Sequence, residues 1–469
     1  MSDKEFIDLK AVAPAEVAEV DLYQHREKIY TRRIEGFFQR IRLYTGWPLL
    51  VGYFLLPWLS WDGRQLVLFD LPARKFHILG LTFWPQDFPM LAFLLIIAAF
   101  ALFAVTTVLG RIWCGYTCPQ TVWTSIFMWL EQKAEGSRNQ RMRRDKGPWS
   151  REKFTRKALK HVSWLFVAYV TGFTFVGYFY PIRELLVDLW TFNLGLMPLA
   201  WIVFFTLATY INAGWMREQV CTYMCPYARF QSVMFDKDTL IVSYDPNRGE
   251  PRGSRKRTVD PAQLGLGDCV DDELCVQVCP TGIDIRDGLQ YECIGCALCI
   301  DACNSVMDKM GYPRGLVRYT SERELEGGNT HWLRPRVLGY ALVLAVMVGL
   351  FSYNMVARIP IELTAIRDRS QLYVATDAGA IENIYTLQLA NKDNSSHEFE
   401  LSISGLQNAS LVGETVHEVQ AGELRSISIR VRAQPDLLEQ PSSKFWIVAQ
   451  ATNAPELRAS VESRFLAPR

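Results

Sequence analysis

The chain has 469 residues, of which 49% are hydrophobic and 13% aromatic, and its formal net charge is +1. This length allows two or three domains, and the hydrophobic fraction argues against a purely soluble protein. A net charge so close to zero identifies no class of partner.

Five apolar stretches follow one another along the chain. Each is close to the ~20 residues that an α-helix needs to cross a bilayer. Pro48 and Pro57 interrupt the first stretch, but membrane helices tolerate proline better than soluble helices do. One such stretch could be a buried soluble helix, whereas five with Trp and Tyr at their edges favour a transmembrane bundle. The expected spans are about 45–61, 88–109, 161–180, 190–213 and 337–357.

Basic residues near the span ends predict the orientation, because Lys and Arg are enriched in cytoplasmic loops. They gather before the first span, from His25 to Arg42, and between the second and third spans, from Arg138 to Lys160. We therefore expect a multi-pass protein of a bacterial inner membrane with a cytoplasmic N-terminus and no cleavable signal peptide. Anionic lipid explains these basic runs better than nucleic acid does, because they adjoin the membrane.

Four cysteines occur in two copies of one motif, each directly after an inward-running span. The copies are Trp113-Cys114-Gly-Tyr-Thr-Cys118-Pro119 and Val220-Cys221-Thr-Tyr-Met-Cys225-Pro226, with Ser125 and Ser232 at equal offsets downstream. The first two spans and the next two therefore form a parallel repeat at the cytoplasmic face.

Cysteines four residues apart are expected on one helical face, and the following proline suits the first turn of a new helix or a kink. Such a pair could bind a soft metal such as Cu(I), form a strained disulfide, or simply pack between helices. The identical spacing of the two copies favours a functional role. The four thiols could form a third metal site, or each pair could act alone.

The remaining seven cysteines lie between Cys269 and Cys303 with the spacing of a two-cluster bacterial ferredoxin. Three thiolates on a tight loop hold one cubane, and a more distant thiolate reaches across to the other. We therefore expect two four-iron clusters. One is assigned to Cys279, Cys293, Cys296 and Cys299. The other is assigned to Cys269, Cys275, Cys303 and, where the pattern requires a cysteine, Asp272.

Asp272 would be a harder ligand than a thiolate, although a carboxylate also binds iron. A three-iron cluster is therefore the alternative at this site. Zinc is less consistent with the spacing, because zinc sites usually need two separate Cys-x2-Cys pairs. Disulfides are disfavoured because cytoplasmic thiols stay reduced.

After the fifth span, hydrophobic and polar residues alternate. Period-two runs at 381–389, 399–403, 427–431 and 445–447 predict strands separated by polar turns. Their spacing over about a hundred residues suggests an immunoglobulin-like sandwich. The expected domains are an N-terminal segment 1–44, a membrane domain 45–230, a ferredoxin domain 231–335, a fifth helix 336–357 and a periplasmic sandwich 358–469.

Taken together, the two membrane motifs, the Tyr244–Gly253 stretch, the dicluster run and the C-terminal sandwich resemble the FixG/CcoG cytochrome c oxidase accessory proteins. The resemblance covers nearly the whole chain. It implies reduction of Cu(II) to Cu(I) in the maturation of a cbb-type oxidase, with the oxidase subunits or their copper chaperones as partners and an unknown electron donor. On that basis Cys114, Cys118, Cys221 and Cys225 handle copper or relay electrons to it.

Asp272 departs from the dicluster pattern expected in this family, which leaves the composition and potential of its cluster open. Two other functions are consistent with the sequence. The protein could be an assembly chaperone that binds copper or the oxidase without turnover, or a quinol-linked membrane polyferredoxin.

Overall fold

The computed structural model describes residues 28–468, without 62, 260, 357–359, 369–370, 377–378, 394, 407 and 435–439 and without the side chains of 86, 232, 262 and 263. Most of the predicted N-terminal segment and the side chain of Ser232 therefore lie outside the described residues. The α-helices are α1 (Phe37–Leu55), α2 (Phe88–Leu109), α3 (Ile112–Tyr116), α4 (Pro119–Glu135), α5 (Arg138–Lys146), α6 (Arg151–Val176), α7 (Ile182–Trp190), α8 (Leu196–Thr209), α9 (Pro226–Met234), α10 (Pro246–Gly249), α11 (Leu274–Gln277), α12 (Leu298–Met310), α13 (Glu322–Leu325) and α14 (Pro335–Val356).

Two π-helical segments follow α8, η3 (Tyr210–Met216) and η4 (Val220–Met224). Short 3-10 turns are η1 (Leu56–Trp58), η2 (Pro85–Asp87), η5 (Pro261–Leu264) and η6 (Ile285–Asp287). The strands are β1 (Ser60–Trp61), β2 (Arg64–Gln65), β3 (Val67–Asp70), β4 (Lys75–Ile78), β5 (Leu81–Phe83), β6 (Ile241–Tyr244), β7 (Val317–Thr320), β8 (Ile361–Arg367), β9 (Val374–Ala375), β10 (Ile381–Asn391), β11 (His397–Ser404), β12 (Ser410–Val412), β13 (Val416–Val419), β14 (Leu424–Ala433), β15 (Ser442–Ala451) and β16 (Arg458–Leu466).

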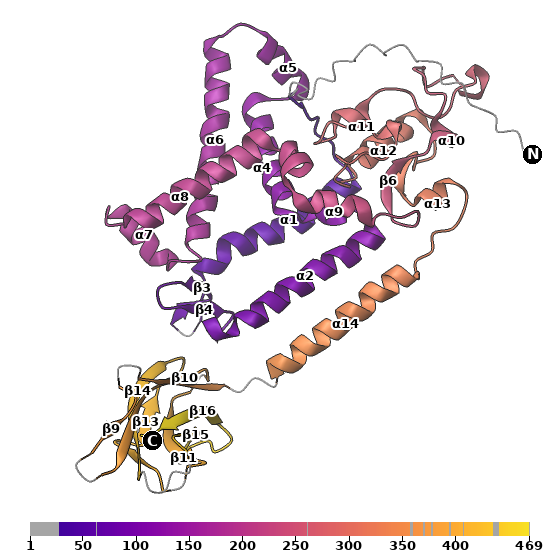
Figure 1. The fold of residues 1–469 in the computed structure, drawn as a ribbon. Coiled ribbons are helices and arrows are strands. Elements are labelled where there is room, and N and C mark those ends of the chain that lie inside the picture. Colours follow the sequence, from indigo (N-terminus) through magenta and orange to yellow (C-terminus); the bar gives the residue numbers. More distant parts are fainter. Residues whose placement is uncertain are drawn as a thin grey trace, which may run out of the picture. The chain divides into compact units, whose positions relative to one another are not determined.

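All five predicted spans fall on helices (Figure 1). Within the described residues, four helical segments are long and apolar enough to cross a membrane: α2, α6, α8 continued by η3, and α14. The first predicted span forms α1, which begins at Phe37 and therefore includes Arg40 and Arg42. The predicted fold class, an α-helical membrane protein, is confirmed. A fifth membrane crossing by α1 stays a prediction.

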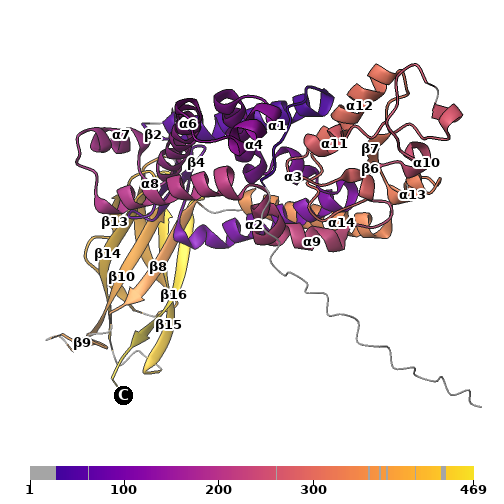
Figure 2. The same cartoon turned by 90° about the horizontal axis from the view of Figure 1, so that it is seen from above.

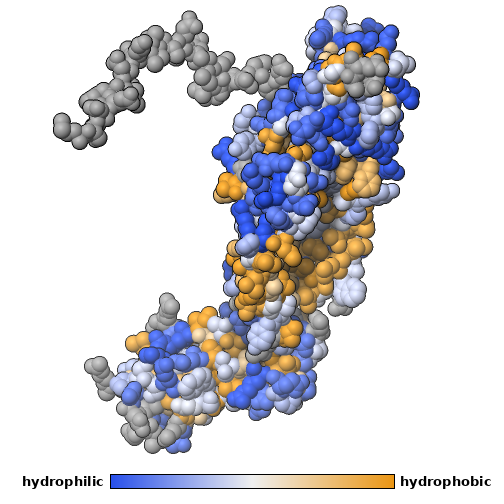
Figure 3. Space-filling model, turned by 90° about the vertical axis from the view of Figure 1, so that its right-hand side faces the viewer, coloured by the Kyte–Doolittle hydropathy of each residue, from blue (hydrophilic) through white to orange (hydrophobic). Residues whose placement is uncertain are grey.

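The chain divides into two compact units, and α2 and α14 belong mainly to the second. These two helices lie side by side in Figures 1 and 2, with Phe93 of α2 against Phe351 of α14 and the Arg334 guanidinium bonded to the Thr107 carbonyl. Since each pair joins the start of one helix to the end of the other, the helices run antiparallel. Figure 3 shows hydrophobic side chains gathered on the molecular surface, and both helices expose leucines of this kind.

The segment between α1 and α2 is more ordered than the predicted outer loop. It forms the β1–β2 hairpin and an antiparallel sheet in the order β3-β4-β5. The strands are only two to four residues long. Such short strands carry almost no period-two signal, which explains why the sequence did not predict them.

The ferredoxin part belongs to the first unit, which comprises residues up to Gly46, Leu109–Phe166 and Tyr210–Thr330. Strands β6 and β7 pair antiparallel, with Tyr244 opposite Val317. Helices α11 and α12 pack with this sheet around a core that includes Val242, Val278, Ile285, Ile300, Ala302, Met307 and Leu316. This core fixes the two cysteine loops.

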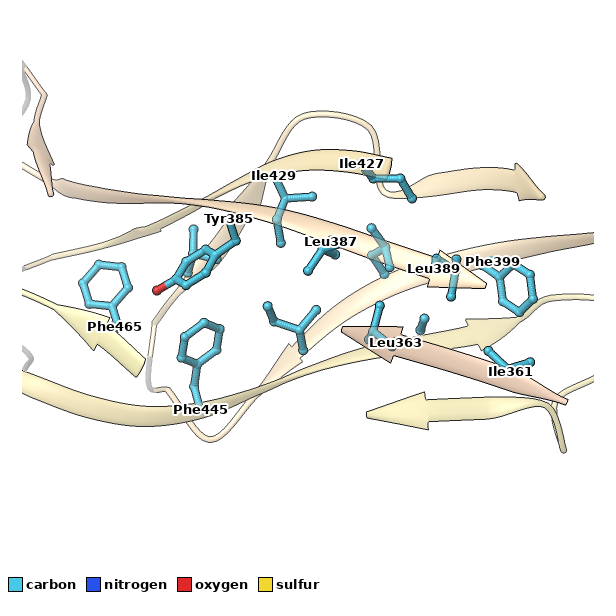
Figure 4. Packing of buried hydrophobic residues seen from close by; sticks show 14 of the residues in the cluster. Ile361, Leu363, Tyr385, Leu387, Leu389, Phe399, Ile427, Ile429, Phe445 and Phe465 are labelled. Atoms are coloured by element: carbon cyan, nitrogen blue, oxygen red, sulfur yellow. The ribbon is translucent and has the colours of Figure 1, made fainter. Parts of the chain in front are cut away.

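The C-terminal part is the predicted immunoglobulin-like sandwich. One sheet has the order β12-β14-β10-β8, with β9 also paired to β10, and the other has the order β13-β11-β15-β16. The strands β8, β10 and β14 are visible side by side in Figure 2. Alternate side chains point into one core, as Figure 4 shows for Tyr385, Leu387, Phe445 and Phe465.

Candidate iron–sulfur and thiol sites

Two small cavities lie side by side in the ferredoxin part. The first cavity is lined by the first predicted ligand set, Cys279, Cys293, Cys296 and Cys299. The second is lined by the other set, Cys269, Asp272, Cys275 and Cys303. Cys275 borders both cavities, so the two sites are adjacent.

The donor sets fit iron–sulfur clusters by their chemistry. Burial raises the pKa of the Cys275 and Cys293 thiols to about 12 and that of Cys303 to about 11. Such thiols become thiolates when a metal displaces their protons. The Arg286 guanidinium lines the second cavity beside the thiols and pairs with Asp284 at 2.6 Å. This guanidinium would lie beside a cluster held by these thiols.

The two membrane motifs have the same local geometry. Cys118 and Cys225 are the N-caps of α4 and α9, and the proline after each occupies the first helical turn. Each of these cysteines donates its backbone N–H five residues back, Cys118 to the Trp113 carbonyl at 2.9 Å and Cys225 to the Val220 carbonyl at 2.8 Å. The two copies of the predicted repeat therefore share the same backbone hydrogen bond and the same helix start.

The expectation that each cysteine pair shares one continuous helical face is wrong. Helix α3 ends at Tyr116 and η4 ends at Met224, so the second cysteine of each pair lies beyond the helix that holds the first. The physical reason is the following proline, which disfavours helical backbone at the residue before it. All eleven cysteines are free thiols, so the strained disulfide does not form in this structure.

The four membrane thiols gather at one place. The Cys114 sulfur lies 3.4 Å from the Gln231 side-chain oxygen on α9, in the other repeat copy. Burial, together with the neighbouring thiols of Cys118, Cys221 and Cys225, raises the pKa of Cys114 to about 12. Within the described residues, however, no three Cys, His, Asp or Glu side chains are close enough to hold a single metal ion.

The first membrane motif packs directly on a ferredoxin loop of the same unit. A Cβ on Gly115 would lie 2.8 Å from the Gly295 oxygen and 2.9 Å from the Cys296 Cα, so only glycine permits this approach. The Arg111 guanidinium donates to the carbonyls of Tyr291 and Cys293. Its other terminal nitrogen donates to a backbone carbonyl of α9 at 2.9 Å. Arg111 thus ties both repeat copies to the loop of one predicted cluster.

A buried ion network joins the repeat copies on another side. The Glu131 carboxylate of α4 lies 2.7 Å from Arg217 and 3.3 Å from Arg141, and all three side chains are at most 9% exposed. The Gln120 amide donates to the carbonyls of Asn212 and Arg217 at 3.0 and 3.2 Å. These contacts connect the helix that starts after Cys118 to the backbone just before the second motif.

Relatives cover most of this chain. It is 39% identical over 452 residues to "Nitrogen fixation protein FixG" of Rhizobium meliloti (strain 1021), a match that covers 88% of this chain and 85% of the relative. The chain belongs to the FixG family. "Protein RdxB" of Cereibacter sphaeroides is 41% identical over 427 residues, which is 86% of this chain and 88% of that protein. "Protein RdxA" of the same organism is 40% identical over 403 residues, with coverage of 82% and 84%.

Three family profiles match parts of this FixG-type chain. The "4Fe-4S dicluster domain" matches residues 216–322, and the "IG-like fold at C-terminal of FixG" matches residues 351–468. A "4Fe-4S binding domain" matches residues 91–136, which contain Cys114 and Cys118. A crystal structure of a FixG-related protein from Vibrio parahaemolyticus is 31% identical, with 24% of this chain and 98% of that chain covered and a TM-score of 0.22.

The FixG-type chain is therefore an iron–sulfur electron-transfer protein of the membrane. The contact residues Gly115, Arg111 and Glu131 were not among the residues singled out from the sequence. The signal for Gly115 was its place between the two cysteines of the first motif. Glu131 and Arg217 offered only isolated charges next to apolar segments, a pattern that does not specify a partner.

Proposed function

We propose that this FixG-type protein reduces Cu(II) to Cu(I) in the maturation of a cbb-type cytochrome c oxidase. Cys114, Cys118, Cys221 and Cys225 bind the copper, and the ferredoxin part supplies the electrons. The observation that carries this proposal is the packing of Gly115 against Cys296, which places the membrane thiols next to a cluster loop. Soft thiolates favour Cu(I), so the product state is stabilised.

Different residues of the chain have different roles in the proposed reaction. When bound by the two ferredoxin ligand sets, each iron–sulfur cluster would supply one electron, and each Cu(II) ion accepts one electron to become Cu(I). A membrane thiol gives up its proton as it binds copper. Arg111 holds the two motifs and the ferredoxin loop in register through its carbonyl contacts, which keeps donor and acceptor at a fixed separation.

A cluster-reoxidation experiment tests the proposal. The purified full-length protein is reduced anaerobically, freed of reductant and mixed with Cu(II) and a Cu(I)-specific chelator. Reduction should yield about two Cu(I) ions per chain as both clusters are reoxidised, and the yield should repeat after each new reduction. A non-catalytic copper chaperone would bind copper while its clusters stayed reduced. A quinol-linked polyferredoxin would instead have its oxidised clusters reduced by added quinol.

A third cluster at the membrane thiols is the second candidate. It is favoured by the "4Fe-4S binding domain" match around Cys114 and by the number of gathered thiols, which is the number a cubane needs. Iron and sulfide analysis separates the two ideas. Two clusters require about eight iron ions per chain and three require about twelve. A value near twelve would contradict the copper role of these thiols.

We further propose that the ferredoxin part faces the cytoplasm and the sandwich faces the periplasm. The antiparallel α2 and α14 support this, because the basic loops require the two spans to run in opposite directions. A reporter active only outside the inner membrane should be silent after Gly253 and active after Asn383. The reverse pattern would overturn the orientation.

The proposed partners follow from the same role. They are the subunits of the cbb-type oxidase or their copper chaperones, anionic lipid at the basic loops, and an electron donor of unknown identity. We propose no nucleic-acid partner. Arg141, one of the basic residues of the loop before α6, is fully buried against Glu131 and does not reach a lipid headgroup.

A further inference from the structure

The two ferredoxin loops share one backbone conformation. Cys269-x2-Asp272-x2-Cys275 and Cys293-x2-Cys296-x2-Cys299 have identical spacing. The residue before Asp272 has φ 54° and the one before Cys296 has φ 64°. The residues after them, Glu273 and Ala297, have φ 55° and 59°. Left-handed backbone is uncommon outside glycine, so its recurrence at matching positions identifies Asp272 as the counterpart of Cys296.

The Asp272 side chain is held by the backbone of its own loop. Its Oδ1 accepts the backbone N–H of Leu274, two residues on, at 3.2 Å. The carboxylate therefore occupies the position of a ligand sulfur, and it lines the cavity together with three cysteines.

The surroundings of the two positions differ. Cys296 is 7% exposed and lies beneath Gly115, whereas Asp272 is exposed to solvent. A cluster held by the first set would have a buried thiol ligand against the membrane motif. A cluster held by the second set would have a carboxylate ligand that solvent reaches. A carboxylate is a harder ligand than a thiolate and holds an iron of a sulfide-rich cluster less firmly.

We propose that Asp272 ligates one iron of the cluster held by Cys269, Cys275 and Cys303. Because this position is exposed to solvent, it is an exchangeable site for divalent first-row metal ions. When ferricyanide removes one electron, Asp272 releases one ferrous ion. Three irons and four sulfides remain on Cys269, Cys275 and Cys303. Under reducing conditions, Fe(II) or Co(II) enters the vacated site and regains the carboxylate as its ligand. The proposal does not depend on copper reduction.

Anaerobic titration of the full-length protein with ferricyanide tests it. The wild-type protein should lose about one iron per chain and gain the paramagnetic signal of an oxidised three-iron cluster. After re-reduction, it should take up about one Co(II) per chain. Asp272→Cys should retain its iron and give no three-iron signal. Asp271→Asn is the matched control, since it removes the neighbouring carboxylate and should lose iron as the wild type does.

Retention of all iron by the wild type at the same oxidant dose would overturn the proposal, as would equal iron loss from Asp272→Cys. Asp272→Asn provides a second test in case the cysteine variant folds poorly, because it keeps the shape of the side chain. This variant should lose iron at a lower ferricyanide dose than the wild type. An unchanged dose would contradict ligation by Asp272. Failure of copper reduction alone would leave these outcomes unaffected.

Discussion

Gly115→Ala should separate the membrane motif from the ferredoxin loop. The new Cβ would lie 2.8 Å from the Gly295 carbonyl oxygen, and ordinary contact begins at 3.4 Å, so the two segments must move apart by about 0.6 Å. Both nearest neighbours are backbone atoms, which have no rotamer to adopt instead. Overpacking of this kind costs about 1–3 kcal/mol.

The assay combines thermal unfolding of the full-length protein with the rate at which Cu(II) reoxidises the reduced clusters. Gly115→Ala should lower the unfolding temperature and slow reoxidation while iron content stays near normal, since Gly115 is not a cluster ligand. Gly52→Ala is the control, because a Cβ at Gly52 meets nothing within 4 Å. Wild-type stability together with a wild-type rate in Gly115→Ala would refute the close contact.

Two further substitutions probe the ion network and the sandwich. Glu131→Gln leaves two buried guanidinium groups without a counter-charge and should reduce the free energy of unfolding by about 3–5 kcal/mol. The control is Glu152→Gln. The Glu152 side chain is 68% exposed, so this change should reduce the free energy of unfolding by less than about 1 kcal/mol. Equal effects in chemical denaturation would contradict the buried network. Phe445→Ala should destabilise the sandwich by about 3–5 kcal/mol without loss of iron, whereas Trp446→Ala, 41% exposed, should have a small effect. Iron loss from Phe445→Ala would show that the clusters depend on the sandwich.

The elements that the sequence predicted are those with local signals. Apolar length marks the membrane helices, and period-two alternation marks strands such as β10 and β14. The ferredoxin ligands lie within short loops, so their spacing alone grouped them into the sets that line the two cavities. Prolines after Cys118 and Cys225 correctly indicated new helices.

The contacts that the sequence did not predict join distant segments. Glu131 and Arg217 are 86 residues apart, and Gly115 meets a loop more than 170 residues further along the chain. No spacing rule links such positions. The same limit applies to the gathering of the four membrane thiols, for which the repeat supplied two equal motifs but left one site or two undecided.

We propose that copper binds to the four membrane thiols and not to the iron–sulfur clusters themselves. The direct measurement is the rate of cluster reoxidation by Cu(II) in a variant with serine at Cys114, Cys118, Cys221 and Cys225. Serine keeps the size and removes the soft ligand. We expect near-normal iron content and a rate at least about tenfold lower than that of the wild type. Full clusters that Cu(II) reoxidises at the wild-type rate would contradict the account.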